Sequence, residues 1–114
     1  MSGKELVLEL ANPMNNAYNK ACDKHPKFHD GIVVKVTPER LKVELAQARE
    51  YCELHNERKE LCFYDLIREE LLEYFDAALS GDWDAARAEL MNCFAVLMRE
   101  YERVADFKQE GGSK

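Results

Sequence analysis

The sequence contains few of the residues that interrupt helices, and it has no long hydrophobic run. Only 3 prolines and 5 glycines occur among its 114 residues. No stretch reaches the ~18 consecutive apolar residues that a membrane-spanning helix needs. The first residues do not lead into the apolar run and small-residue cleavage site of a secretory signal. We therefore expect a cytoplasmic protein that does not associate with membranes.

Positive charge is also scarce. The 16 Lys and Arg residues are outnumbered by 22 Asp and Glu residues, which gives a net charge of −6. This excess would repel a phosphate backbone, so we expect no nucleic-acid partner. The sequence also lacks a glycine-rich phosphate-binding loop. Its hydrophobic fraction of 46% is ordinary for a globular chain and excludes a disordered acidic tail.

The residue pattern changes along the chain. It predicts an N-terminal extension at 1–36, a helical domain at 37–106 and a flexible tail at 107–114. Within the extension, Asn12-Pro13 is typical of a helix start, so a short helix is expected over Pro13–Lys24. The apolar segments Leu6–Leu10 and Ile32–Val36 also allow a minor pair of β-strands.

Three longer helices are expected after the extension. Thr37-Pro38 is an N-cap followed by a first-turn proline, and the apolar stripe that follows loses phase near Arg58–Cys62. A second helix is predicted at 63–79 and a third at 83–106, separated by Ser80-Gly81 and the N-cap Asp82. A connection this short makes the two helices antiparallel. The predicted fold class is therefore an all-α antiparallel helical bundle built on an αα-hairpin.

Two pairs of polar residues lie partly on the apolar side of this hairpin. Glu70 and Glu73 are three residues apart on one helix, as are Glu89 and Asn92 on the next. Glu73 precedes Gly81 by the same eight residues by which Glu89 follows it. Equal offsets from the turn lie side by side in an antiparallel hairpin. We therefore expect Glu73 opposite Glu89, and Glu70 opposite Asn92.

Three converging carboxylates repel one another unless a cation joins them. Mg²⁺ and Mn²⁺ take carboxylate and amide oxygens, and paired polar residues on facing helices are a known way to build a metal site in a bundle. Alternatively, one or more of the acids pairs with a nearby arginine, of which Arg68, Arg87 and Arg99 are the candidates. Spacing alone does not decide between these two readings.

The acidic pattern resembles a known family signature. Glu69-Glu70-Leu71-Leu72-Glu73, a short turn and then Glu89-Leu90-Met91-Asn92 resemble the E-E-x-x-E and E-x-x-D motifs of the MazG-like all-α nucleotide pyrophosphohydrolases. That superfamily includes the dimeric dUTPases and dCTPases. The resemblance covers about residues 38–105, and the fourth motif position departs from it, because Asn92 replaces the usual Asp. The amide keeps one oxygen ligand and loses a charge, so metal affinity should fall.

The resemblance implies an activity and a role for each matching residue. Glu70, Glu73, Glu89 and Asn92 would hold Mg²⁺ or Mn²⁺, and Glu69 would orient a catalytic water or support the site. The substrate would be a nucleoside triphosphate, hydrolysed to the monophosphate and pyrophosphate. Apart from the resemblance, Arg99 lies seven residues past Asn92 on the same helix face, so it could reach a phosphate of the substrate or instead pair with Glu102. The family also implies a homo-oligomer, either a dimer or a tetramer.

Two alternatives remain open at this point. With Asn92 in place of Asp, the enzyme could be weakened. The first alternative to an enzyme is a non-catalytic helical interaction protein that retains the scaffold, of the kind that phages or mobile elements carry. The second alternative is a small zinc-stabilised module. Its ligands would be two Cys-x-x-His pairs, Cys22 with His25 and Cys52 with His55.

Overall fold

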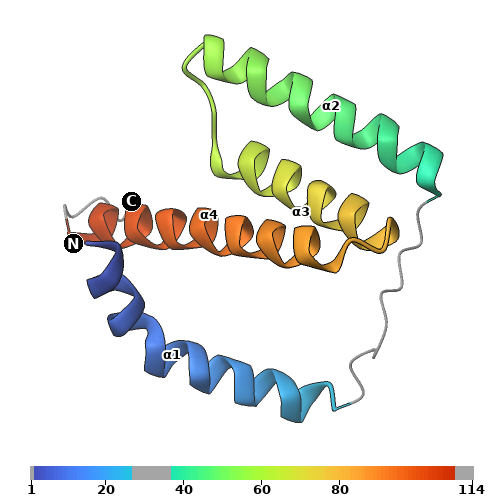
Figure 1. Cartoon of the computed structure of the whole chain (residues 1–114). Helices are drawn as coiled ribbons and strands as arrows, with labels where there is room; N and C mark the ends of the chain where they lie inside the picture. The colour runs from blue at the N-terminus through green and yellow to red at the C-terminus, as the bar shows by residue number, and fades with distance from the viewer. Residues whose placement is uncertain (1, 27–36, 110–114) are drawn as a thin grey trace. The chain divides into compact units, whose positions relative to one another are not determined.

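The computed structural model describes residues 2–26 and 37–109, and every regular element in these ranges is an α-helix (Figure 1). The elements are α1 (Gly3–Lys24), α2 (Pro38–Glu57), α3 (Phe63–Leu79) and α4 (Trp83–Gln109). The chain divides into two units, Met1–Val33 and Val34–Lys114. The prediction of an all-α fold is confirmed. None of the described helices is both long enough and apolar enough to cross a membrane.

The N-terminal segment differs from its prediction. Leu6–Leu10 lies in α1, so the strand expected there is wrong, and the helix does not begin at Pro13, which lies inside it. The helix starts earlier because the Ser2 hydroxyl accepts a hydrogen bond from the Glu5 backbone N–H at 3.1 Å. Short apolar runs fit strand and helix equally well. The other expected strand, Ile32–Val36, lies outside the described residues.

The three C-terminal helices begin and end largely where their capping residues predict. The Thr37 hydroxyl accepts from the Arg40 backbone N–H at 3.2 Å and starts α2. The Asp82 carboxylate accepts from the Ala85 N–H at 3.1 Å and starts α4. The predicted third helix stops three residues too early, since α4 extends to Gln109.

The α3–α4 turn is a Schellman motif. Asp82 N–H donates to the Ala77 carbonyl at 3.0 Å, and Gly81 N–H donates to the Ala78 carbonyl at 3.1 Å. Gly81 has φ of 75°, a left-handed conformation that side chains with a Cβ disfavour. The helix therefore stops and reverses within Ser80–Asp82, which fixes the register of α3 against α4.

Replacing Gly81 tests this turn. Gly81→Ala is expected to destabilise the chain by about 1–2 kcal/mol, because a Cβ is strained in the left-handed region. The space around Gly81 is open, so no steric clash adds to that cost. Thermal unfolding should show a midpoint lower by about 4–8 °C per kcal/mol. Gly3→Ala, at an open helical position, is the control and should lose no stability. An unchanged midpoint in Gly81→Ala would contradict this account of the turn.

The core of the second unit lies along the contact of α2 with α3. Leu41, Leu45 and Ala48 of α2 pack with Leu72 of α3, and Phe75 covers the same cluster. The α3–α4 contact buries smaller side chains, namely Ala78, Ala86 and Cys93. Helix α3 thus lies between α2 and α4 (Figure 1), and its polar residues are partly shielded from solvent.

Candidate metal centre

The hairpin brings three of the four predicted ligands together. Glu70 and Glu73 of α3 and Glu89 of α4 each place a carboxylate oxygen within 4.8 Å of the other two. All three side chains are half-buried. The i,i+3 spacing puts the first two on one face of α3, and the Gly81 turn sets Glu89 against them. Among the described residues, no other set of three His, Cys, Asp or Glu side chains places its donor atoms within 4.8 Å of one another.

Asn92 lies at the margin of this group. Its side chain is exposed, and its Nδ2 donates a hydrogen bond to Glu89 Oε2 at 3.3 Å. The amide also favours the charged form of Glu70, which partly offsets the rise in the pKa of that carboxyl. In this arrangement Asn92 orients two of the acids.

Proximity and burial disfavour three full negative charges at this site. Burial raises the pKa of Glu73 to about 7, and the neighbouring carboxyl of Glu89 adds to the rise through a shared hydrogen bond and its charge. Burial and Glu89 also raise the pKa of Glu70. In addition, Glu70 Oε2 is buried with no hydrogen-bond partner among the described residues. Such an atom costs free energy unless a proton or a cation satisfies it.

An arginine that the sequence analysis did not consider reaches the cluster from α2. Arg49 Nε lies 3.5 Å from Glu73 Oε1, and 55% of the Arg49 side chain is exposed. One solvent-exposed guanidinium offsets part of the charge of three carboxylates, and exposed pairs contribute little stability. Arg68, a predicted partner for the acids, instead lies over the Tyr51 ring, 5.9 Å from its centroid.

Glu69 lies on the α2 side of the acidic cluster. Its carboxylate is next to the Cys52 thiol of α2. Burial raises the pKa of that thiol to about 12, and Glu69 contributes to the rise by its hydrogen bond and negative charge. The half-buried Glu69 is thus held between the two helices, adjacent in sequence to the ligand candidate Glu70.

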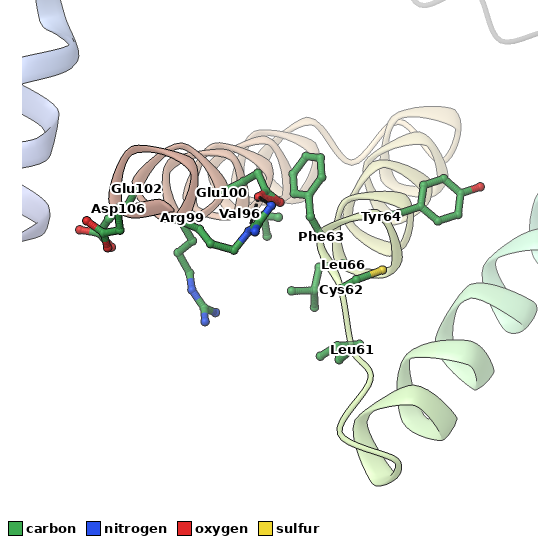
Figure 2. Close-up of a pocket in the computed structure, with 11 residues that line it drawn as sticks. Leu61, Cys62, Phe63, Tyr64, Leu66, Val96, Arg99, Glu100, Glu102 and Asp106 are labelled. Carbon is green, nitrogen blue, oxygen red and sulfur yellow. Dashed lines mark hydrogen bonds and ion pairs between the residues drawn. The ribbon is translucent and has the colours of Figure 1, made fainter. Parts of the chain in front are cut away.

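Arg99 is not brought to the glutamates. It is ten residues beyond Glu89, about 15 Å along the axis of α4 at the helical rise. It lines an open groove of about 750 Å³ whose apolar part includes Phe63, Leu66 and Val96 (Figure 2). The predicted alternative partner Glu102 makes no ion pair with Arg99 in the described part of the chain. The ion pair in this segment joins Arg103 to Glu100.

Comparison of the chain with known proteins identified no similar protein. No protein-family model matches the chain, and neither does any curated protein or solved structure. The resemblance to the MazG-like family therefore rests on the acidic sequence motif alone.

Proposed function

We propose that the chain is a MazG-like nucleoside triphosphate pyrophosphohydrolase homologue in which Glu70, Glu73 and Glu89 bind Mg²⁺ or Mn²⁺. The observation that carries this proposal is the convergence of three half-buried carboxylates, one of which has a buried oxygen without a partner. Acidic clusters without a cation are usually exposed, where water screens the repulsion. Here burial removes part of that screening.

The donor set agrees with a hard divalent cation. All three ligands offer carboxylate oxygens, which Mg²⁺ and Mn²⁺ prefer to nitrogen or sulfur. The unpartnered Glu70 Oε2 is the kind of atom that a cation satisfies. Asn92 neutralises no charge, and it holds Glu89 in place by its hydrogen bond.

In the proposed reaction, water attacks the α-phosphorus of the triphosphate, the bond to the bridging oxygen of the β-phosphate breaks, and pyrophosphate leaves. The bound cation supplies charge neutralisation for the phosphate oxygens. Glu69 accepts the proton of the attacking water, since it is the carboxylate next to the ligand set. Arg49, mostly exposed beside Glu73, is placed to bind a phosphate. Arg99 is assigned to the far end of the substrate because of its separation along α4.

A screen for pyrophosphate release tests this function. Each common ribo- and deoxyribonucleoside triphosphate is incubated with the chain and Mg²⁺ or Mn²⁺, beside the Glu89→Gln variant. We expect turnover of at least one nucleotide and a loss of about 100-fold or more in the variant, since a ligand that stabilises transition-state charge is removed. Absence of turnover on every nucleotide, or equal turnover in the variant, would refute the proposal.

We also propose that two or more copies of the chain associate through α4. Phe94, Leu97, Tyr101 and Val104 recur at three- and four-residue spacing along this helix, and each is more than 40% exposed. An apolar stripe of this length is typical of an association surface. The same stripe would serve the alternative function, a non-catalytic helical interaction protein.

Disrupting the stripe tests the association. Leu97→Asp is expected to shift the chain from dimer or tetramer to monomer, because a charge would be buried at the contact. Analytical ultracentrifugation measures the change. Ala95→Asp, on the opposite face of α4 and also exposed, should leave the mass unchanged. A wild-type chain that sediments as a monomer at every concentration would contradict the proposal.

A further inference from the structure

A second group of metal-ligating side chains lies where α2 ends and α3 begins. Cys52 and His55 are three residues apart near the end of α2, and Cys62 and Asp65 are three apart at the start of α3. The full spacing is C-x2-H-x6-C-x2-D. Pairs of sulfur, nitrogen and carboxylate donors at close spacing, joined by a short connection, are typical of zinc sites. The proposed function uses none of the four.

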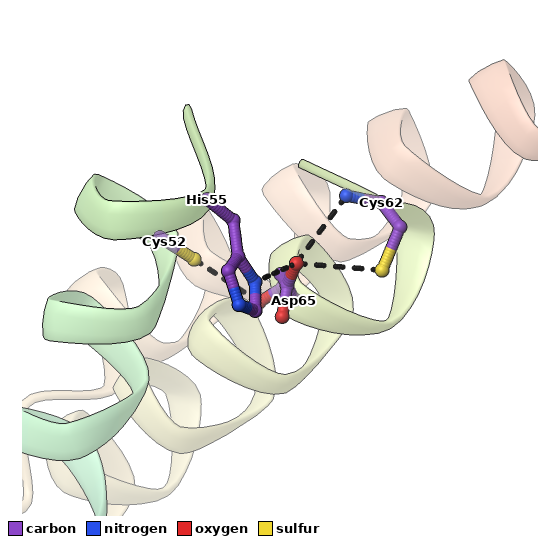
Figure 3. A network of polar contacts seen from close by, with 4 residues as sticks. All are labelled: Cys52, His55, Cys62 and Asp65. Carbon is purple, nitrogen blue, oxygen red and sulfur yellow. Dashed lines mark hydrogen bonds and ion pairs between the residues drawn. The ribbon is translucent and has the colours of Figure 1, made fainter. Parts of the chain in front are cut away.

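The structure gathers the other three residues around Asp65 (Figure 3). His55 Nδ1 lies 2.7 Å from Asp65 Oδ2, and Cys62 Sγ donates to the same oxygen at 3.3 Å. Cys52 Sγ donates to the Asp65 backbone carbonyl, also at 3.3 Å. Asp65 is the one charged residue that is buried among the described residues, with 8% of its surface exposed.

The surroundings of this group favour a cation. Asp65 and Glu69 both place negative charge near the Cys52 thiol, and together with burial they oppose its ionisation. The His55 ring stacks on Tyr51 at 6.0 Å between centroids, which restrains the imidazole. A divalent cation would neutralise the two carboxylates and take both sulfurs as thiolates.

We propose that Cys52, His55, Cys62 and Asp65 bind one Zn²⁺ ion that fastens α2 to α3. The four donor atoms are not close enough to one another to share one coordination sphere. Among the described residues, only the glutamate group has three donor atoms that are. The Cys62 thiol already contacts the Asp65 carboxylate, whereas Cys52 would have to change its side-chain rotamer to turn from the Asp65 backbone carbonyl toward that carboxylate. On binding, two thiol protons pass to solvent and their place is taken by the ion.

This site differs from the zinc site that the sequence left open as an alternative. Cys52 and His55 belong to both, while Cys22 and His25 belong to the N-terminal unit. The two ligands that replace them, Cys62 and Asp65, come from the start of α3. The proposed zinc site shares no ligand with the glutamate centre, which offers oxygen donors only, although Glu69 lies beside both.

Cobalt substitution in the full-length chain tests the proposal. Co²⁺ added to one equivalent should give the intense thiolate-to-cobalt charge-transfer absorption of a tetrahedral site, and Zn²⁺ should abolish it. Cys52→Ser and Cys62→Ser should each lose about half of this absorption, because each removes one of two thiolates. Cys22→Ser, which removes an exposed thiol, is the matched control and should change nothing.

Other outcomes would overturn the site. These are the absence of a charge-transfer band at one equivalent, or a band that survives both Cys52→Ser and Cys62→Ser. X-ray absorption spectroscopy of the Zn²⁺-loaded wild-type chain identifies the atoms bound to the ion and so tests the site without a variant. Two Zn–S distances near ~2.3 Å are expected, and a shell of oxygen and nitrogen alone would refute the proposal.

Discussion

Glu73→Gln is expected to stabilise the metal-free chain at pH 8 and to weaken its binding of Mn²⁺. The stabilisation follows from the raised pKa of Glu73, about 7 compared with an ordinary 4.5. At pH values between these two pKa values, Glu73 of the folded chain holds a proton that the unfolded chain has released. The free energy of unfolding therefore falls as the pH rises through this range, by up to about 3 kcal/mol from this residue alone. Glutamine cannot ionise and avoids this loss.

The same substitution acts in the opposite direction when metal is bound. A bound cation stabilises the folded chain by an amount that grows with its concentration relative to the dissociation constant. Loss of one of three charged ligands should weaken Mn²⁺ binding by about 10–100-fold or more. Saturating Mn²⁺ should thus raise the unfolding temperature of wild type far more than that of Glu73→Gln.

Chemical unfolding at pH 5 and pH 8, with chelator and with Mn²⁺, measures both effects. Glu53→Gln, an exposed position on α2, is the control and should leave stability and Mn²⁺ binding unchanged. If Glu73→Gln is less stable than wild type at pH 8 in chelator, the burial of the Glu73 charge and its repulsion by Glu89 are not the dominant effects there. The Arg49 ion pair would then be the more important contact.

Asp65→Ala is expected to be the most destabilising single substitution at the α2–α3 junction. The Asp65 carboxylate accepts hydrogen bonds from His55, from the Cys62 backbone N–H at 3.3 Å and from the Cys62 thiol. Its removal leaves the His55 imidazole and the backbone N–H of Cys62, the N-cap residue of α3, without their partner. Leaving donors in this partly buried junction without their acceptor costs about 1–3 kcal/mol for each of them. We expect a fall of at least 10 °C in the unfolding midpoint of the chelated chain.

The contribution of Asp65 should depend on pH with a defined sign. The hydrogen bond with His55 is the main cause that lowers the pKa of this carboxyl. Because the pKa of Asp65 is lowered in the folded chain, this carboxylate stabilises the fold at pH values above its ordinary pKa of 3.8. The stabilisation is lost as the pH falls below that value. The difference between wild type and Asp65→Ala should therefore shrink in acid. A difference that is constant from pH 7 to pH 3 would contradict this assignment.

Much of the second unit could be predicted from local sequence signals. Thr37-Pro38 and Asp82 mark the starts of α2 and α4, and the bounds of α3 are as predicted. The antiparallel register of the glutamates followed from counting residues on both sides of Gly81. That count succeeds because a short Schellman turn leaves no freedom in the relative position of the two helices.

Other features depend on packing that local sequence does not encode. The register of α2 against α3 is set by Leu41, Leu45 and Leu72 across a connector of several residues, so the approach of Arg49 to Glu73 could not be counted from a turn. The gathering of Cys62 and Asp65 with His55 has the same origin. At the N-terminus, the Ser2 cap decided between helix and strand for an apolar run that fits both.

Titration calorimetry of the chain with Mn²⁺ tests the central claim most directly. The account predicts one ion bound per chain at the α3–α4 hairpin, with binding lost in Glu70→Gln and retained in Cys62→Ser. Glu70 is the most informative position because its Oε2 is buried without a partner. Absence of Mn²⁺ binding to the wild-type chain, or equal binding by Glu70→Gln, would contradict the account.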